Sequence, residues 1–384
     1  MVPITVLIPA YNAVGTIERA VTSAMMENPE AILLIDDGSD DATVEVACRA
    51  ADSRLHVLRR AENGGVAAAR NTALQSVGSN YAIWLDSDDE LMPGRAARMT
   101  DALRNGADVV YAGVTLLSSD APPRPCPIPE FMFQPWGGWR LYERNWVQGI
   151  GCPAVRVDAV RDIGYDETLI CAEDYDFALR SVASGKKVSF LGGADYGYHL
   201  RSQSLSRDLV QSNADTGTVL RKHNARQVVE RLEGQGMPKA VAIWCATSMS
   251  VQQGHYDAAL SFLGSIRELG LQKAEVLEPD GPYSISNGCR EDFLEGTLHL
   301  LQGKAAKALP FLKAAAEWGR EREVENNLAV ALAQSGDLET ARRILQGICA
   351  DFPHYQDAVR NLSMELPTVV TRLPLRRPPS RSRY

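Results

Sequence analysis

Apolar and polar positions alternate between two periods along the first half of the chain. Short runs rich in β-branched and large apolar residues, such as ITVLIPAYN and AILLIDDGSD, end in polar residues. Between these runs lie segments such as TIERAVTSAM and VAAARNTALQSV, whose apolar positions have helical spacing. Strands that alternate with helices predict an α/β domain with a mostly parallel sheet covered on both faces.

Polar side chains follow several of the predicted strands at the point where each strand stops. Tyr11 follows the first strand, and Asp36 and Asp37 follow the second. Asp86 and Asp88 come directly after the fourth, which is the apolar run in YAIWLDSDDEL. Ligands of open parallel sheets bind beyond the carboxyl ends of the strands, so one crevice is expected to collect these groups. Like charges gathered there are tolerable if a cation, or a ligand that carries one, lies among them.

After about residue 215 the pattern becomes helical only. Two stretches about 33 residues apart, FLEGTLHLLQGKAAKALPFLKAA and NNLAVALAQSGDLETARRILQGICADFP, have the register of a tetratricopeptide repeat. WCATSMSVQQGHYDAALSFLGSI is a looser third copy, separated from the next by an insertion containing EPDGPYSISNG. An ordinary helical bundle is the alternative. The matching positions are Gly254, Tyr256, Ala259, Leu263, Gly296, Gly303, Ala308, Leu312, Ala315, Leu328, Ala329, Gly336, Ala341, Leu345, Ile348 and Pro353.

These patterns divide the chain into four segments. We expect an α/β domain over 1–215, a helical linker over 216–239, helical repeats over 240–366 and a basic, proline-rich, disordered tail over 367–384. Within the first domain, the proline-rich stretch 121–135 is expected to be irregular. The segment WGGWRLYERNW that follows it is either a packed loop or a wall facing a sugar or acceptor.

Composition narrows the classes of partner. The net charge of −8 over 384 residues argues against nucleic acid or an anionic membrane as a general partner, because either requires a basic face. The seven cysteines form no CxxC pair, which indicates reduced thiols. No apolar stretch approaches the roughly 20 residues that span a bilayer, and the first residues have no basic region typical of a signal peptide. We expect a cytoplasmic protein without an integral membrane segment.

Five motifs together resemble those of family 2 glycosyltransferases, inverting enzymes of the GT-A fold. They are VLIPAYNAVGTIERAVTSAM, LLIDDGSDDAT, ENGGVAAARNTAL, YAIWLDSDDEL and AEDYDFALR. Any one of them is a weak signal, but five in the family's order and spacing are a strong one. The resemblance covers roughly residues 1–205 and implies a nucleotide-diphospho-sugar transferase with a Rossmann-like, mostly parallel sheet.

The resemblance also implies where the nucleotide of the donor binds. Pro9, Ala10 and Tyr11 would form the edge of the base site, with Tyr11 stacked on the nucleobase. Asp37 would accept the N–H of the base ring, which favours uracil or thymine. Its alternative role is to cap the helix after Ser39. Arg70 is implied as a contact of the pyrophosphate or the base.

Two carboxylates spaced two apart at a strand end suit a metal ion. Asp86 and Asp88 can hold Mg²⁺ or Mn²⁺, which would bridge the two phosphates and stabilise the departing diphosphate. The resemblance makes Asp88 the direct ligand and places Asp86 on the ribose or the metal, with Ser87 beside the donor. His199 is either a further metal ligand or a structural residue. Asp89 is expected to cap the helix predicted in ELMPGRAARM.

The fifth motif supplies the expected base. Asp174, next to Glu173, matches the aspartate that takes the acceptor's proton as the acceptor attacks the anomeric carbon. Glu173 and Asp176 could raise the pKa of Asp174 by like-charge repulsion. The alternative is an acidic helix N-terminus that only favours the helix dipole. Arg201 and Ser204 are available for the phosphates.

These readings combine into a metal-dependent inverting glycosyltransferase with a nucleotide-sugar donor, a UDP-sugar being favoured. The acceptor is expected to be a peptide or protein held by the helical repeats, an architecture similar to that of sublancin-type peptide S-glycosyltransferases. The repeats could also form a homodimer. Synthesis of a cell-surface or capsular glycan is the alternative acceptor chemistry. A non-catalytic scaffold is a further alternative, against which the intact Asp86, Asp88 and Asp174 argue.

Overall fold

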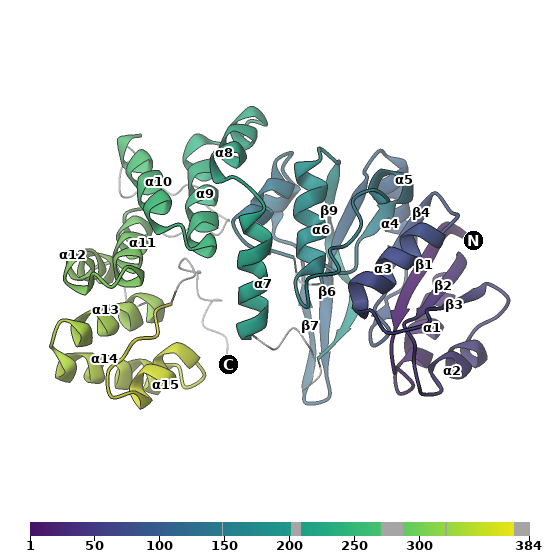
Figure 1. The fold of residues 1–384 in the computed structure, drawn as a ribbon, viewed down its shortest axis with the longest axis horizontal. Helices are drawn as coiled ribbons and strands as arrows, with labels where there is room; N and C mark the ends of the chain where they lie inside the picture. Colours follow the sequence, from purple (N-terminus) through teal and green to yellow (C-terminus); the bar gives the residue numbers. More distant parts are fainter. Residues whose placement is uncertain (148, 201–208, 270–286, 319–320, 372–384) are drawn as a thin grey trace. The chain divides into compact units, whose positions relative to one another are not determined.

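The chain folds into two compact units, Met1–His223 and Asn224–Tyr384 (Figure 1). The division falls inside 216–239, the stretch that the sequence marks as a linker. The structure is a computed structural model, and the residues it describes are 1–147, 149–200, 209–269, 287–318 and 321–371.

The first unit is an α/β domain built on a nine-stranded sheet, counted over the described residues. Its strands are β1 Val2–Ala10, β2 Pro29–Asp36, β3 Leu55–Arg59, β4 Tyr81–Trp84, β5 Glu90–Leu91, β6 Val109–Ser118, β7 Ala121–Cys126, β8 Ala154–Arg156 and β9 Val188–His199. Its helices are α1 Ile17–Met26, α2 Thr43–Ala50, α3 Gly65–Ser76, α4 Arg95–Arg104, α5 Val157–Val160, α6 Glu173–Ala183 and α7 Leu209–Arg221, with 3-10 turns η1 Glu130–Phe133 and η2 Gly137–Tyr142.

The sheet is mixed rather than mostly parallel. Its order is β3-β2-β1-β4-β8-β6-β9-β5, with β7 paired to β6. The four strands β3, β2, β1 and β4 are parallel, as the alternation of strands and helices predicts. Beyond them β8 runs antiparallel to both β4 and β6, and β5 runs antiparallel to β9. The prediction of a parallel sheet therefore holds for β3, β2, β1 and β4 and for the pair β6 and β9, but not for β5, β7 and β8.

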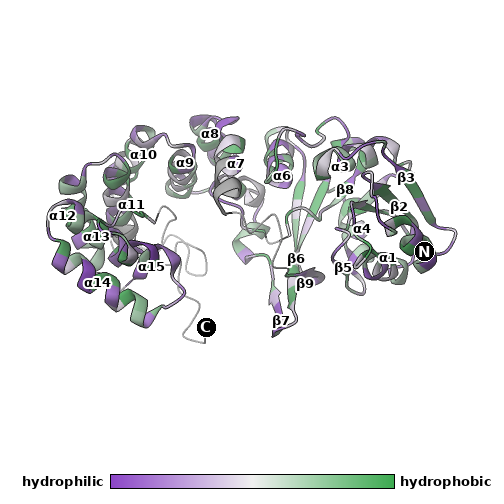
Figure 2. Cartoon of the chain, turned by 60° about the horizontal axis from the view of Figure 1, so that its bottom comes forward, coloured by the Kyte–Doolittle hydropathy of each residue, from purple (hydrophilic) through white to green (hydrophobic). Residues whose placement is uncertain are grey.

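Helices cover both faces of the parallel half. Ile4, Val6 and Ile8 alternate along β1 and belong to one core cluster with buried residues of α1, α2 and α4. Helix α3 contacts β1 and β2, and its buried residues lie outside that cluster, so it covers the opposite face. Strands such as β6 and β8 are coloured as hydrophobic in Figure 2. Burial on both faces explains why these strands read as apolar runs rather than alternating ones.

The proline-rich stretch 121–135 is not irregular throughout, which corrects the expectation from the sequence. Its first part forms β7, which pairs antiparallel with β6 through Thr115 opposite Pro125 and Leu116 opposite Arg124. Among the described strands β7 pairs with β6 only, so it is an edge strand. Proline, which has no N–H to donate, is tolerated on such an edge.

The second unit is helical. Its helices are α8 Ala225–Gly234, α9 Lys239–Gln253, α10 Tyr256–Glu268, α11 Asn287–Leu301, α12 Ala305–Ala316, α13 Arg322–Gln334, α14 Leu338–Asp351 and α15 Gln356–Ser363.

Consecutive helices of this unit pack in pairs, with α9 against α10, α11 against α12 and α13 against α14. A Cβ on Gly296 would lie 2.5 Å from Cγ of Leu312, so the small residue lets α11 and α12 approach closely. The insertion predicted between two repeats falls largely on 270–286, outside the described residues. None of the described helices combines the length and the apolar character that a membrane crossing requires.

The first residues of the predicted disordered tail are packed instead. The segment 367–371 is hydrogen-bonded to α13 and α15, and Thr371 is buried. Buried amide side chains pair with its main chain, an interaction that a composition-based prediction of disorder cannot register. The rest of the tail, 372–384, lies outside the described residues.

Gly113 marks the place where β6 needs the absence of a side chain. A Cβ there would lie 2.4 Å from the carbonyl oxygen of Gly193 and 2.6 Å from that of Cys126. Gly113→Ala is therefore expected to lower the free energy of unfolding by about 2 kcal/mol, measured by urea denaturation. Gly78→Ala is the matched control, because nothing lies within 4 Å of its added Cβ. Equal stability of the two variants would contradict the close approach at β6.

Candidate active site

A cavity of about 910 Å³ opens at the carboxyl ends of β1, β2 and β4. All the site residues expected from the sequence line it, except His199. The predicted residues on its wall are Pro9, Ala10, Tyr11, Asp37, Arg70, Asp86, Ser87, Asp88, Glu173 and Asp174.

The pairing of the parallel strands explains this convergence. Ala10 lies opposite Asp36 in the β1–β2 ladder, and Leu7 lies opposite Trp84 in the β1–β4 ladder. The turns that follow these strands therefore leave the sheet at the same edge. The order β2-β1-β4 also makes β1 the point at which the chain changes direction across the sheet, where open α/β sheets form their crevice.

Arg70 is the buried cation at the centre of the site. Its Nη2 lies 3.0 Å from Oδ1 of Asp86, and its Nη1 lies 2.8 Å from Oε1 of Glu173. The guanidinium carbon is 5.8 Å from the ring centre of Trp84 and 5.4 Å from that of Tyr165. Arg70 thus joins the end of β4 to the start of α6 by two charge-assisted hydrogen bonds.

The backbone in front of α6 is held in an uncommon conformation. Ala172 has φ of 62°, in the left-handed region that non-glycine residues rarely adopt. The next two residues, Glu173 and Asp174, begin the helix and line the cavity. Strained backbone of this kind persists where the surrounding structure fixes it, often at functional sites.

Glu173 and Asp174 are carboxyl groups with raised pKa values. Burial and the neighbouring charge of Asp174 raise the pKa of Glu173 to about 7, although Arg70 opposes the shift. Removal from bulk water also raises the pKa of Asp174, again against the attraction of Arg70. Carboxyl groups whose pKa values are raised by burial suit a proton transfer nearer physiological pH than ordinary carboxyl groups do.

Asp86 and Asp88 present a donor set that suits a hard divalent cation. The side chain of Asp86 is 30% exposed, and both residues line the cavity. The main-chain carbonyl of Asp88 accepts a hydrogen bond from Arg19, which fixes the turn. Mg²⁺ is commonly bound by one or two carboxylates plus phosphate oxygens of a substrate, so the pair fits such an ion. Within the described residues, no three His, Cys, Asp or Glu side chains are already grouped as a metal site.

His199 is not among the residues that line the cavity. Its main-chain N–H donates to Oδ1 of Asp89 at 2.8 Å, and its Nε2 lies 3.6 Å from Oε1 of Glu90. The antiparallel pairing of β5 with β9 accounts for this position, because it aligns Glu90 with Gly197. His199 therefore does not belong to the cavity wall. Arg201 and Ser204 lie outside the described residues.

Asp89 does not cap a helix, which corrects the expectation from the sequence. Helix α4 begins only at Arg95, after Gly94. Asp89 is buried and accepts hydrogen bonds from Tyr196 Oη at 3.0 Å and from His199 N. Burial, with Asp86 and Asp88 nearby, raises its pKa to about 8. Its role is to tie the acidic turn after β4 to β9.

Asp37 connects the end of β2 to the start of α3. Its carboxylate accepts the N–H of Gly65 at 2.8 Å and that of Gly64 at 3.2 Å, and it pairs with Arg60. Asp37 still lines the cavity, so it combines a capping contact with a position on the wall. Its neighbour Asp36 is fully buried and accepts the N–H of Ser39 at 3.1 Å, inside the turn.

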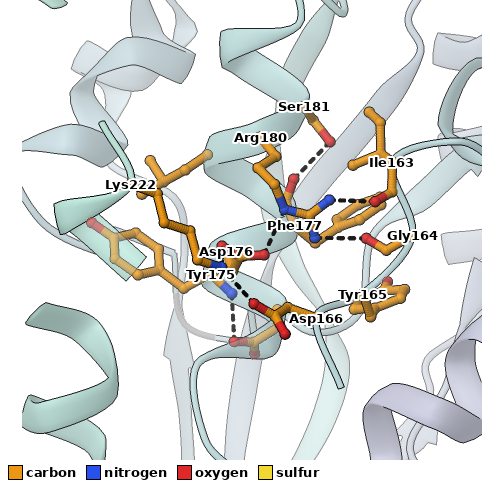
Figure 3. A network of polar contacts seen from close by, with 12 residues as sticks. Ile163, Gly164, Tyr165, Asp166, Tyr175, Asp176, Phe177, Arg180, Ser181 and Lys222 are labelled. Atoms are coloured by element: carbon orange, nitrogen blue, oxygen red, sulfur yellow. Dashed lines mark hydrogen bonds and ion pairs between the residues drawn. The ribbon is translucent and has the colours of Figure 1, made fainter. Parts of the chain in front are cut away.

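Asp176 is not on the cavity wall and is not among the causes of the raised pKa of Asp174, contrary to what the sequence suggested; it lies instead in a network with Arg180 and Lys222 (Figure 3). It is fully buried and pairs with Arg180 and with Lys222, each at 2.6 Å. Lys222 also pairs with Asp166 at 2.7 Å. Side chains two apart on a helix point in different directions, which separates Asp176 from the base.

The tryptophans of the segment WGGWRLYERNW pack against other side chains, and Asn145 is the residue of this segment that lines the cavity. Trp139 stacks on Tyr142 with ring centres 5.5 Å apart, and Trp146 meets Phe131 edge-on at 5.1 Å. Neither tryptophan is on the cavity wall, nor is Trp136. Of the two readings of this segment, the structure supports the packed loop.

The sequence reasoning missed the wall formed by the stretch after this loop. Gly151 lines the cavity, and a Cβ on it would lie 3.0 Å from Nη2 of Arg70 and 3.1 Å from Oδ2 of Asp174. Cys152 follows it, with Sγ 3.6 Å from Oδ2 of Asp86. The two glycines in GIGCP were the available signal, because closely spaced glycines often mark a backbone that approaches a functional group.

Comparison with known proteins identifies the class of this domain. Residues 5–150 match the family described as Glycosyl transferase family 2. This part of the chain is thus similar to family 2 glycosyltransferase domains, and the mixed sheet with helices on both faces fits a GT-A fold.

Among curated proteins, the succinoglycan biosynthesis protein ExoU of Rhizobium meliloti (strain 1021) is 35% identical over 219 residues, 53% of this chain and 64% of that protein. This chain thus spans less than two thirds of ExoU. The UDP-Glc:alpha-D-GlcNAc-diphosphoundecaprenol beta-1,3-glucosyltransferase WfgD of Escherichia coli is 25% identical over 214 residues, 55% of this chain and 80% of that protein. Among solved structures, S. aureus TarS 1-349 has a TM-score of 0.48 at 19% identity, covering 82% of this chain and 90% of that one.

The two aspartates at the start of α6 should affect stability in opposite ways. Asp176→Asn weakens two ion pairs of a buried carboxylate and should lower the free energy of unfolding by about 3 kcal/mol. Asp174→Asn at about pH 8 should leave it unchanged or raise it, because the folded state no longer ionises a group whose pKa is raised. Urea denaturation of both variants measures this. Similar losses in both would show that Asp174 is a structural residue.

Proposed function

We propose that this protein is a metal-dependent, inverting glycosyltransferase that takes a sugar from a nucleotide-diphosphate donor and adds it to a glycan of the cell surface. One observation carries the proposal. The acidic turn after β4, with Asp86 and Asp88, and the acidic start of α6, with Glu173 and Asp174, face a single cavity at the carboxyl edge of the sheet.

The nucleotide is proposed to bind at the ends of β1 and β2. Tyr11 is 46% exposed on the cavity wall and can stack on a nucleobase. Asp37 is nearby on the same wall and can accept the ring N–H of uracil. The name of the relative WfgD, which gives UDP-glucose as its donor, supports a UDP-sugar here as well.

Asp88 and Asp86 are proposed to hold the divalent ion, Mn²⁺ or Mg²⁺, together with the phosphates of the donor. When bound, such an ion neutralises the charge that develops on the departing diphosphate. Asp86 is already held by Arg70, so its carboxylate is oriented before a ligand arrives. His199 is not assigned to the ion, because it lies off the cavity wall.

Asp174 is proposed to take the proton of the acceptor. A carboxyl group with a raised pKa is a stronger base than an ordinary aspartate. Attack of the acceptor on the face opposite the diphosphate inverts the anomeric configuration in one displacement. Glu173 keeps Arg70 close to the base and tunes its pKa by charge.

The class of acceptor is supported by the relatives. ExoU is named for succinoglycan biosynthesis, and WfgD for transfer to a lipid-linked sugar. Both names favour a saccharide acceptor over the peptide or protein expected first from the sequence. Tetratricopeptide repeats, a peptide acceptor and a homodimer through the helical unit remain predictions.

Replacement of the proposed base is the direct test. Asp174→Asn should lower the rate of sugar transfer, with a panel of nucleotide sugars and Mn²⁺, by about 10³-fold. Asp101→Asn, an exposed aspartate on α4, is the matched control and should keep full activity. Chelation of divalent ions should abolish turnover in the unaltered protein, and added Mn²⁺ or Mg²⁺ should restore it.

Nucleotide release is measured by chromatography for every donor. If the unaltered protein releases no nucleotide with any donor, the non-catalytic scaffold is the better account. If Asp174→Asn and the unaltered protein release it equally fast, another group is the base.

The pH profile tests the electrostatics of the pair. Since the base must be ionised and burial raises the pKa of Asp174, kcat/KM should fall as the pH is lowered through the pKa of this group, above the pH range of an ordinary aspartate. Glu173→Gln removes a negative neighbour of Asp174. The positive charge of Arg70 then stabilises the Asp174 carboxylate more strongly. The pKa of the base then falls, and the acidic limb of the profile should move to lower pH. An unmoved limb would assign the titration to a different group.

A further inference from the structure

The helical unit contains a polar wall that binds main chain. Asn326 and Asn327 on α13 and Asn361 on α15 are fully buried. The segment 367–371, which follows α15 and runs back towards α13, passes along them without forming a helix or strand (Figure 1). Three buried amides in a helical core are costly unless their hydrogen bonds are satisfied.

The asparagines form many of those bonds with the backbone of this segment, and the others with one another and with the hydroxyl groups of Thr297 and Thr371. Asn361 accepts the N–H of Val369 at 2.7 Å and donates to the carbonyl of Val369 at 2.7 Å. Asn327 accepts the N–H of Thr371 at 2.8 Å and donates to its carbonyl at 3.0 Å. Asn326 adds a second bond to the carbonyl of Val369 at 3.1 Å.

The asparagine side chains present hydrogen-bond donors and acceptors to the segment in the way that the backbone of a β-sheet edge strand does. One carboxamide offers a donor and an acceptor in one plane, which matches the N–H and C=O of one extended residue. Val369 and Thr371 are two apart, so their main-chain groups face the same side of an extended chain. Asn361 and Asn327 therefore form hydrogen bonds with alternate residues of the extended segment, as a neighbouring strand would.

One side chain of the segment is also bound. The Thr371 hydroxyl donates to Oδ2 of Asp357 at 2.8 Å and contacts Tyr355 and Asn326. Val369 is only half-buried, and Thr368 is exposed. The wall thus favours an extended backbone with a hydroxyl side chain at the Thr371 position. The side chains of Thr368 and Val369 contribute little to this recognition.

The wall also extends beyond the residues that 367–371 now contact. Asn327 also donates to the buried Thr297 on α11 at 2.9 Å, so the network of buried polar side chains reaches a third helix. Helices α11, α13 and α15 are alternate helices along the chain, and α13 contacts both α11 and α15.

We propose that this wall, formed by Asn326, Asn327 and Asn361, is a binding site for an extended segment of a partner polypeptide with serine or threonine at the Thr371 position. The chain's own residues 367–371 are its built-in competitor. A guest recognised through main-chain atoms need not share their sequence. The short connection after α15 keeps the competitor at a high effective concentration, so a partner must outcompete a tethered segment. The proposal does not depend on the transfer reaction.

The test uses the whole chain with a site-specific protease sequence inserted between Glu365 and Leu366, both exposed. Cleavage removes the tether and leaves every residue in the sample. A fluorescent peptide with the sequence of residues 366–376 should bind the cleaved protein, measured by anisotropy, and should bind the uncleaved protein at least about tenfold more weakly.

Peptide variants separate backbone recognition from side-chain packing. N-methylation at Val369 removes the N–H that Asn361 accepts and should weaken binding about tenfold. N-methylation at Val370, to which none of the three asparagines bonds, is the control and should have a smaller effect. Val369→Thr keeps shape and backbone and should change the affinity less than about threefold. Thr371→Val should weaken binding several-fold, because it removes the hydroxyl that Asp357 accepts.

The protein variant Asn361→Asp keeps the size of the side chain and removes its donor. In the cleaved protein it should weaken peptide binding about tenfold while circular dichroism reports unchanged helix content. The proposal is overturned if the cleaved protein binds no peptide, if N-methylation at the two valines has equal effects, or if the cleaved protein dimerises without taking up peptide.

Discussion

The first unit depends on the compensation of converging negative charge by Arg70. The end of β4 and the start of α6 are distant in sequence, and both bring carboxylates to the same cavity. Arg70 binds one from each, Asp86 at 3.0 Å and Glu173 at 2.8 Å. Trp84 and Tyr165 flank the guanidinium, so it is confined as well as buried. Without this cation the two acidic segments would repel each other, and the cavity would lose its shape.

Helix α6 separates two uses of a carboxylate within one turn. Asp176 is fully compensated by Arg180 and Lys222 and anchors the helix. Glu173 and Asp174 share the partial compensation of Arg70 and keep raised pKa values. The anchor allows the pair to stay under-compensated, since the helix does not rely on them for its position. Such a division between stability and reactivity is common at active sites.

The helical unit shows a related division in its core. Most of its helix contacts are apolar, as in the cluster around Ala341, Leu345 and Ile348. The three asparagines interrupt that pattern on the surface of α13 and α15, and their bonds end on an extended backbone. A polar group in this position specifies a bound segment rather than helix packing, because packing would be better served by apolar side chains.

The sequence by itself determined the local features of this protein. The apolar runs, their polar ends and the helical spacing located β1 to β4 and the helices between them, and the five motifs pointed to the site residues that now line one cavity. Those features follow from periodicity and from turn chemistry, which act over a few residues. The same signals marked the helical unit and the position of its small residues.

Tertiary structure decided what depends on distant partners. The antiparallel insertion of β8 made the sheet mixed, and the pairing of β5 with β9 gave Asp89 and His199 surroundings that a local pattern cannot reveal. Gly151 and Cys152 joined the wall only because their loop folds back over Arg70. Segment 367–371, which composition assigned to a basic, proline-rich tail, is packed because buried asparagines supply its hydrogen bonds. In each case the deciding contact joins residues far apart in the chain, and its strength depends on burial, which composition and periodicity do not specify.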